Sequence, residues 1–273
     1  MGSLAEWRQE LELTWRIARM RIAAQMQFQG SFLMQLFGNS IMTVMEIVTV
    51  LIFFQQFPAL GGWTLDEVLM LYAMCAIAFE IADSIQNGLD LIPQQVRTGD
   101  FDRLMTRPMS VYLQAITLDI SVRHIGKTLV AAGLFGWAWL RLDLTLTAET
   151  LFLLVSAWIC GVALFIAIFT LGAIVSFWTV GSVEVVNAIS YGGSDLAQYP
   201  IHIYRRWFRT IFIWLIPIGF VIYYPTLIIL DKPDPLGFAS IAPVIGPLLT
   251  LAFVMVVGLL WRQGVNHYHS TGS

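Results

Sequence analysis

Apolar residues run in long stretches along this chain, and short polar segments separate them. Several stretches exceed the roughly 20 residues that an α-helix needs to cross the hydrocarbon core of a bilayer. The clearest ones predict spans at residues 31–57, 64–91, 111–140, 148–178 and 239–261. At the start of the second, Thr64 and Glu67 have the spacing of a capping box, in which each side chain accepts from the other residue's backbone N–H. The pattern therefore predicts an all-α integral membrane protein.

Residues 4–28 have a different pattern, because apolar side chains recur at helical spacing while charged side chains fill the remaining arc. The apolar positions are Leu4, Trp7, Leu11, Trp15, Ala18, Ile22 and Met26, and the charged positions are Arg8, Glu12, Arg16 and Arg19. An amphipathic helix of this kind lies in the membrane interface rather than across the bilayer. We therefore expect an N-terminal interfacial helix at 4–28.

Residues 179–238 allow two interpretations. Hydropathy places one span at 210–230 and makes the preceding segment a cytoplasmic linker, whose basic residues Arg205, Arg206 and Arg209 would obey the positive-inside rule. Alternatively, 181–199 forms a polar fifth span, and two short helices dip into the membrane from outside and turn at Pro217. Irregular backbone at membrane depth is tolerated where protein covers it. The pattern of residues alone slightly favours the first interpretation.

Composition and charge refine this picture. Of the 273 residues, 58% are hydrophobic and 12% are charged, which leaves room for about six helical spans and no sizeable water-soluble domain. Four arginines precede the first span and five basic residues lie between 97 and 127, whereas the loop at 141–147 carries only Arg141. The positive-inside rule then places both chain ends and the segment 96–110 in the cytoplasm.

Motifs for catalysis and cofactor binding are missing from the sequence. Gly126-Lys127-Thr128 resembles the end of a phosphate-binding loop, but the glycine required earlier is replaced by Ser121 and no strand precedes it. The histidines lack metal-ligand spacing with one another, apart from His267-Tyr-His269 near the end of the chain. We therefore expect no catalytic residues, no metal site and no ATP site in this chain.

Carboxylates within the predicted spans are the main candidates for an intramembrane function, since charge at that depth is costly. They are Glu46, Glu80 and Asp83, and the polar stretch 181–199 adds Glu184 and Asn187. Glu80 and Asp83 share a helix face at i,i+3. They can pair with Arg123 or Lys127 in a structural role, or they can carry protons or substrate. Both interpretations stay open.

The charged segment 96–110, VRTGDFDRLMTRPMS, lies between two predicted spans. We expect one short helix in it, with Phe101, Leu104 and Met105 aligned at i, i+3 and i+4 as an apolar knob. Asp100 or Asp102 suits the positive N-terminal end of that helix, and Pro108 turns the chain after Arg107. A rigid apolar knob ringed by charge is suited to transmit motion from a soluble partner.

Four stretches together carry a resemblance. GGWTLDEVLMLYAM at 61–74, the segment 96–110, YPIHIYRRWFRTIFIWLIPIGFVIYYP at 199–225 and the tail HYHSTGS at 267–273 follow one another in the expected order. In these stretches, and over nearly its whole length, the chain resembles the membrane subunit of ABC-2 type ABC transporters. The resemblance does not indicate the cargo.

The resemblance implies a single transmembrane domain over 1–273 with the type V exporter fold of six spans. The helix at 4–28 would be the connecting helix, and a re-entrant pair at 200–230 would lie between the fifth and sixth spans. The coupling helix would comprise Gly99, Asp100, Phe101, Asp102, Arg103, Leu104, Met105 and Arg107, with Pro108 following. The gate would comprise Tyr199, Pro200, Trp207, Arg209 and Pro217. One departure is Arg205, where many relatives are expected to have proline.

The resemblance also implies partners and location. A permease of this kind works in a bacterial plasma (inner) membrane, with both termini cytoplasmic, beside a second permease that is identical or paralogous. Two cytoplasmic ABC ATPase subunits would bind ATP and Mg, so this chain would bind no cofactor; membrane lipid surrounds it and no nucleic acid is involved. An ion-coupled secondary transporter using Glu46, Glu80 and Asp83 is the alternative. That class predicts inverted internal repeats, which the sequence lacks.

Overall fold

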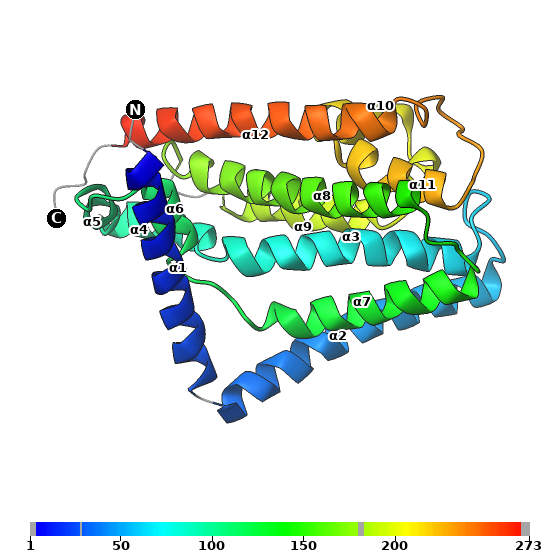
Figure 1. Ribbon diagram of the computed structural model, residues 1–273, viewed down its shortest axis with the longest axis horizontal. Coiled ribbons are helices and arrows are strands. Elements are labelled where there is room, and N and C mark those ends of the chain that lie inside the picture. The colour runs from blue at the N-terminus through cyan, green and yellow to red at the C-terminus, as the bar shows by residue number, and fades with distance from the viewer. Residues whose placement is uncertain (1–3, 28, 180–182, 269–273) are drawn as a thin grey trace.

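The computed structural model describes residues 4–27, 29–179 and 183–268, apart from the side chains of 4–7, 11 and 183–189. The described residues fold into helices joined by short connections (Figure 1). The first half contains α1 (Leu4–Met26), α2 (Gln29–Gln56), α3 (Leu65–Gln86), η1 (Leu89–Leu91), α4 (Ile92–Thr98), α5 (Phe101–Met105), α6 (Val111–Ile116) and α7 (His124–Arg141). The second half contains α8 (Ala148–Val175), α9 (Val183–Ala197), η2 (Ile201–Ile203), α10 (Arg206–Thr210), η3 (Ile211–Leu215), η4 (Gly219–Tyr223), α11 (Tyr224–Ile229) and α12 (Ala242–His267).

Among the described residues, four helices are long and apolar enough to cross a membrane, namely α2, α3, α8 and α12. The chain is thus a multi-pass membrane protein with four candidate spans, or five if the bent pair described below is one span. The expected six are not reached, because α7, which includes His124, Lys127 and Arg141, is less apolar than these four helices and α9 is only 15 residues long. At the start of α3, the Thr64 backbone N–H donates to Glu67 Oε2 (2.7 Å), as the capping box predicted.

The helix α3 lies at the centre of the bundle, between α7 and α8 (Figure 1). In its most apolar window 83% of the residues are buried, compared with 11% for α2 at the edge of the molecule. Small residues allow its neighbours to approach closely: a Cβ on Gly161 of α8 would lie only 2.8 Å from the Cβ of Ala78 on α3. Close backbone approach through small residues is typical of helix pairs in membranes.

The predicted continuous third span at 111–140 is wrong. The helix ends after Ile116, where the Thr117 hydroxyl donates back to the carbonyls of Leu113 (2.8 Å) and Gln114 (3.1 Å), and a new helix begins at His124. Backbone groups of the intervening segment are satisfied by other parts of the chain. Gln25 of α1 bonds the Ile120 carbonyl (2.6 Å) and the Val122 N–H (3.2 Å). Non-helical backbone is tolerated here because protein covers it.

Residues 206–229 form a sharply bent helix pair instead of the single straight span that hydropathy favoured. The first arm, Arg206–Leu215, and the second, Gly219–Ile229, meet at 79°. The bend contains Pro217, which is buried, and each arm includes a π-helical stretch, η3 or η4. The helix α9 precedes this pair and packs on α8. The structure thus has the bent arrangement of the second interpretation.

The helix α1 crosses the long axis of the bundle instead of following it (Figure 1). It starts near the end of α12, and the short helices α4 and α5 lie at that same end of the molecule. The loop between α7 and α8 lies at the opposite end. The segment 96–110 is therefore on the side of the molecule where the described chain begins and ends.

Candidate functional site

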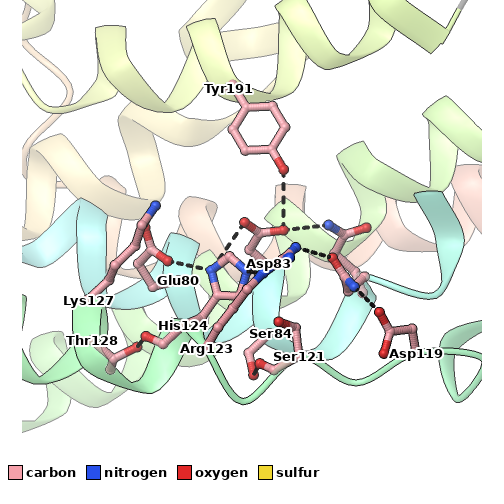
Figure 2. A network of polar contacts seen from close by, with 12 residues as sticks. Glu80, Asp83, Ser84, Asp119, Ser121, Arg123, His124, Lys127, Thr128 and Tyr191 are labelled. Atoms are coloured by element: carbon pink, nitrogen blue, oxygen red, sulfur yellow. Dashed lines mark hydrogen bonds and ion pairs between the residues drawn. The ribbon is translucent and has the colours of Figure 1, made fainter. Parts of the chain in front are cut away.

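A buried polar network joins α3 to α7 (Figure 2). His124 Nδ1 lies 2.7 Å from Glu80 Oε2 and 3.4 Å from Asp83 Oδ2, and Lys127 Nζ lies 3.2 Å from Glu80 Oε1. The side chains of His124, Glu80 and Asp83 are at most 10% exposed. Glu80 and Asp83 face the same side of α3, as predicted, and His124 and Lys127 have the same i,i+3 spacing on α7.

The break in the third span positions this network. Because α7 begins at His124, its first turn lies beside the second half of α3 instead of continuing from α6. Ser84 fixes the connection by accepting the Ser121 N–H with its carbonyl (3.1 Å) and donating its hydroxyl to the Ser121 carbonyl (2.7 Å). Asn87 also bonds Asp119 of the same connection. The non-helical segment 117–123 thus places His124 and Lys127 beside the carboxylates of α3.

The contacts of His124 determine its tautomer. Nδ1 faces two carboxylate oxygens and must carry a hydrogen to bond them, whereas Nε2 accepts from Arg123 Nε at 3.3 Å and so carries none. Lys127 pairs with Glu80, whereas the exposed Arg123 donates from its guanidinium to Asn87 (3.1 Å). Buried charges are tolerated when they are paired in this way.

The sequence predicts no metal site, yet Glu80, Asp83 and His124 have the spacing of metal ligands. Each offers one ligand atom, and these atoms lie within 4.8 Å of one another. Two carboxylates and one imidazole are common ligands of divalent metals. However, Lys127 Nζ is 3.2 Å from Glu80, and its charge opposes a metal cation at that position. Because Lys127 already pairs with Glu80, ion pairing explains the arrangement better than a bound metal.

Tyr191 of α9 extends the network towards a third helix. Its hydroxyl lies 3.5 Å from Asp83 Oδ1, and Gln86 Nε2 donates to the same oxygen at 2.7 Å (Figure 2).

Outside the spans, burial and then the charge of Asp83 raise the pKa of Asp90 to about 6. Asp90 lies in η1, immediately before α4 and α5.

Glu46 does not join Glu80 and Asp83. Its carboxylate accepts from the Tyr72 hydroxyl (2.7 Å) across α2 and α3. Both residues line a polar cavity of about 70 Å³ between α2, α3, α7 and α9, together with Glu80, Lys127 and Asp195. Three carboxylates and one ammonium group therefore face a common space. The predicted polar residues Glu184 and Asn187 lie outside the described side chains.

The apolar face of the segment 96–110 points inward, so the predicted exposed knob is wrong for two of its three residues. Phe101 is fully buried and Leu104 is 4% exposed, while Met105 is 42% exposed. The Phe101 ring packs edge-on against Phe177, at the end of α8, and Tyr268, beyond α12, with ring centres 5.2 and 4.9 Å away. Periodicity identified the apolar face correctly but could not show that these distant residues cover it.

The remaining residues of this segment form its outer surface. Arg103, Met105, Arg107 and Pro108 are exposed, and Arg103 pairs with Asp100 at 3.3 Å. Gly99 ends α4 with a positive φ of 78°, a conformation that favours glycine and turns the chain into α5. Asp100 is the N-cap residue of α5 and Asp102 lies in its first turn, the positions expected for carboxylates. Gln114 donates to the Leu104 (3.0 Å) and Met109 (2.9 Å) carbonyls and fixes the segment to α6.

The predicted gate residues lie around the bent pair at the opposite end of the molecule. Pro200 and Pro217 are buried, Tyr199 and Arg209 are partly buried, and Trp207 is 63% exposed. His202 was not predicted as a site residue. Its Nε2 donates to the Gly61 carbonyl (2.8 Å), and its Nδ1 bonds the Tyr223 hydroxyl (2.9 Å). It ties the segment before the bend to the loop between α2 and α3.

A comparison with protein families decides the class of this chain. Residues 40–272 match the family described as "ABC-2 family transporter protein". The chain belongs to the ABC-2 family of transporter proteins. The match begins within α2 and extends past the end of α12, so it includes the polar network, α4–α5 and the bent pair. No curated protein and no solved structure matched the chain. Permeases of the ABC-2 family typically lack an ATPase domain of their own.

For this ABC-2 permease, sequence reasoning located most of the important groups but not all of their contacts. The pairing of Glu80 with Lys127 was one of its two predicted alternatives, and the structure has that pair. Arg123 contacts Asn87 and His124 instead of a carboxylate. His124 and Tyr191 were missed as partners. The i,i+3 spacing of His124 and Lys127, which mirrors Glu80 and Asp83, was a signal that could have identified His124.

Proposed function

We propose that this chain is the membrane-spanning permease subunit of an ATP-driven exporter, with ATP and Mg bound by two separate cytoplasmic ABC ATPase subunits. The observation that carries the proposal is the ABC-2 family match over residues 40–272. The position of α4 and α5 supports it, because they form a compact structure at the end of the bundle where α1 starts and α12 ends (Figure 1). A second permease, identical or paralogous, completes the translocation path.

In this proposal the chain is a single domain with six spans: α2, α3, the broken α6–α7, α8, α9 and α12. The bent pair at 206–229 is re-entrant and gates the outer side, and α1 lies in the cytoplasmic interface. Both termini face the cytoplasm of a bacterial inner membrane. The loops between α3 and α8 fit this orientation, since Arg97, Arg103 and Arg107 lie between α3 and α6 and only Arg141 lies on the connection from α7 to α8. Arg205, Arg206 and Arg209 of the bent pair then lie near the outer face.

The segment 99–108 is the coupling element, and its exposed and buried residues have different roles. Its exposed residues Met105, Arg107 and Pro108 contact the ATPase. Its buried residue Phe101 is held between Phe177 and Tyr268, so movement of α5 is transmitted to the ends of α8 and α12. Close-packed interiors transmit such displacements because they have little free volume.

Cargo crosses between the two permeases, along α2, α3 and α9. The polar cavity lined by Glu46 and Asp195 lies where these three helices meet α7, and α2 leaves most of its apolar surface unburied by the rest of the chain. A second permease covering α2 would place two such cavities near each other. ATP binding draws the ATPase subunits together and switches the side to which the path opens, and hydrolysis resets it.

Purification of the tagged chain from its native membranes tests the proposal. An ABC ATPase subunit is expected to co-purify with the unaltered chain. Met105→Asp places a charge on the proposed contact and is expected to reduce the recovered ATPase at least ten-fold. The matched control is Leu146→Asp, since Leu146 is 66% exposed on the loop at the opposite end. Recovery that is equally unaffected by both substitutions would contradict the coupling assignment.

An ion-coupled secondary transporter is the second candidate function. The observation that favours it is the buried network in which His124 bridges Glu80 and Asp83, since such groups can relay protons. It predicts proton-dependent transport by the purified chain in liposomes with no ATPase present, and loss of that transport in Glu80→Gln. Transport only after an ATPase and ATP are added would eliminate this candidate.

A further inference from the structure

A large groove lies on the surface between α6, α8 and α12, away from the polar network. Its volume is about 770 Å³. Most of its walls are apolar, with Ile116, Ile166, Val254, Val257 and Trp261 among the lining residues. Its polar residues are few, and the charged one, Arg262, lies in the last third of α12 with Asn266 one turn further on.

Small residues create this groove. Ala163 and Ala167 line it from α8 and Gly258 lines it from α12. A Cβ added at Gly258 would meet no atom within 4 Å, which shows that the space above it is open. From Val254 to Val265 the groove follows α12 for about 17 Å at the rise of an α-helix. That length is close to one leaflet, half of the roughly 30 Å hydrocarbon core.

Charge distinguishes the two ends of the groove. Arg262 is exposed and, in the described part of the chain, forms no ion pair with a carboxylate. The Tyr112 hydroxyl on the wall is already bonded to Thr170 (3.0 Å) and does not compete for a ligand. An arginine near the end of a spanning helix reaches the interface and matches the geometry of phosphate. The other end, near Ala163 and Val254, is apolar.

The geometry points to a binding site for one anionic phospholipid of the leaflet on the side of the chain ends. An acyl chain occupies the groove between α8 and α12, and the headgroup phosphate binds Arg262, with Asn266 and Ser110 as further polar neighbours. Basic pockets between spanning helices recognise anionic lipids in this way. The exposed apolar residues Val244, Leu248, Leu251, Met255 and Leu259 indicate that α12 faces lipid along its length. This site does not depend on which partner drives transport.

Native mass spectrometry of the full-length chain in detergent tests the inference, with titrations of phosphatidylglycerol and phosphatidylcholine. We expect one tightly bound phosphatidylglycerol, with at least ten-fold higher affinity than phosphatidylcholine. Arg262→Gln is expected to lower the affinity for phosphatidylglycerol about ten-fold, equivalent to about 1.4 kcal/mol, and Arg262→Lys to restore part of it. Arg97→Gln is the matched charge control, because Arg97 is exposed at the same end but outside the groove.

A second pair of variants tests the acyl chain. Gly258→Leu fills the groove and is expected to abolish tight binding of phosphatidylglycerol. Gly133→Leu makes the same change on α7, where an added Cβ also meets nothing within 4 Å, and is expected to have no effect. If Gly258→Leu fails to fold, the comparison of Arg262→Gln with Arg97→Gln still decides the question.

Three results would overturn the inference. Equal affinity for the two lipids, with no effect of Arg262→Gln, would show unselective contact with the bilayer. Equal losses in Arg262→Gln and Arg97→Gln would show diffuse attraction by surface charge. Loss of a dimer in Gly258→Leu, with lipid binding retained, would show that a second copy of the chain occupies the groove.

Discussion

Replacement of Lys127 by methionine and Glu80 by glutamine, singly and together, measures how strongly the buried network holds α3 and α7. The Lys127 and Glu80 side chains are 23% and 10% exposed and lie 3.2 Å apart. At an effective dielectric constant of about 20, their attraction is about 5 kcal/mol before desolvation. Removing one partner of a buried pair typically costs about 3–5 kcal/mol, because the other charge loses its counter-ion. Because Lys127 is still 23% exposed, we expect Lys127→Met to lower the free energy of unfolding by about 3 kcal/mol, the lower end of this range.

The free energy of unfolding, from tryptophan fluorescence during denaturation by dodecyl sulfate in mixed micelles, is the appropriate measurement. The double variant is expected to lose much less than the sum of the single losses, with a coupling energy of about 2 kcal/mol. The exposed pair Arg8 and Glu12, at 3.5 Å, is the control and should give a coupling of about 0.3–0.5 kcal/mol. Equal coupling in the two cycles would refute the claim that burial makes this ion pair important.

Three further changes test other parts of the structure. Phe101→Ala should destabilise the chain by about 3–5 kcal/mol, because a fully buried aromatic side chain leaves a cavity; the same denaturation experiment measures this. Gly88→Ala should lower the melting temperature, because its Cβ would clash with the carbonyl oxygens of Ala115 and Ile116, whereas Gly136→Ala on α7 meets nothing and should not. Asp90→Asn should stabilise the chain above pH 6 but not near pH 4. Folding raises the pKa of Asp90 from 3.8 to about 6, so the folded state favours the neutral carboxyl. The stability that neutral Asp90 contributes is fully present below about pH 4 and is lost as the pH rises through about 6. The gain in the free energy of unfolding of Asp90→Asn between pH 4 and pH 7.5 is at most about 3 kcal/mol, and partial exposure reduces it to about 2 kcal/mol. Melting curves at the two pH values measure this gain.

Four of the long helices were predictable because their apolar stretches are uniform. The spans expected at 31–57, 64–91, 148–178 and 239–261 became α2, α3, α8 and α12, with ends displaced by up to six residues. The stretch 111–140 misled the prediction because hydropathy averages over a local break. Gln25 and Ser84 stabilise that break from α1 and α3, and contacts so distant in sequence have no local signal.

The candidate sites show the same division between local and distant information. The spacing of Glu80 and Asp83 fixed their common helix face, and the positions of Asp100 and Asp102 relative to α5 followed from helix electrostatics. The burial of Phe101 did not follow, because Phe177 and Tyr268 approach it only after α8 and α12 pack together. Likewise, the contact between Tyr191 and Asp83 depends on how α9 packs beside α3.

Site-directed cross-linking at the end of α5 tests the coupling assignment most directly. Met105→Cys carries a thiol on the exposed surface, and Leu146→Cys carries one on the opposite end of the molecule; the native Cys75 and Cys160 are buried and half-buried, and the unaltered chain measures their background. In membranes that contain the co-expressed ATPase, a short thiol-reactive cross-linker is expected to join Met105→Cys, but not Leu146→Cys, to the ATPase subunit. Cross-linking from Leu146→Cys, with none from Met105→Cys, would contradict the account.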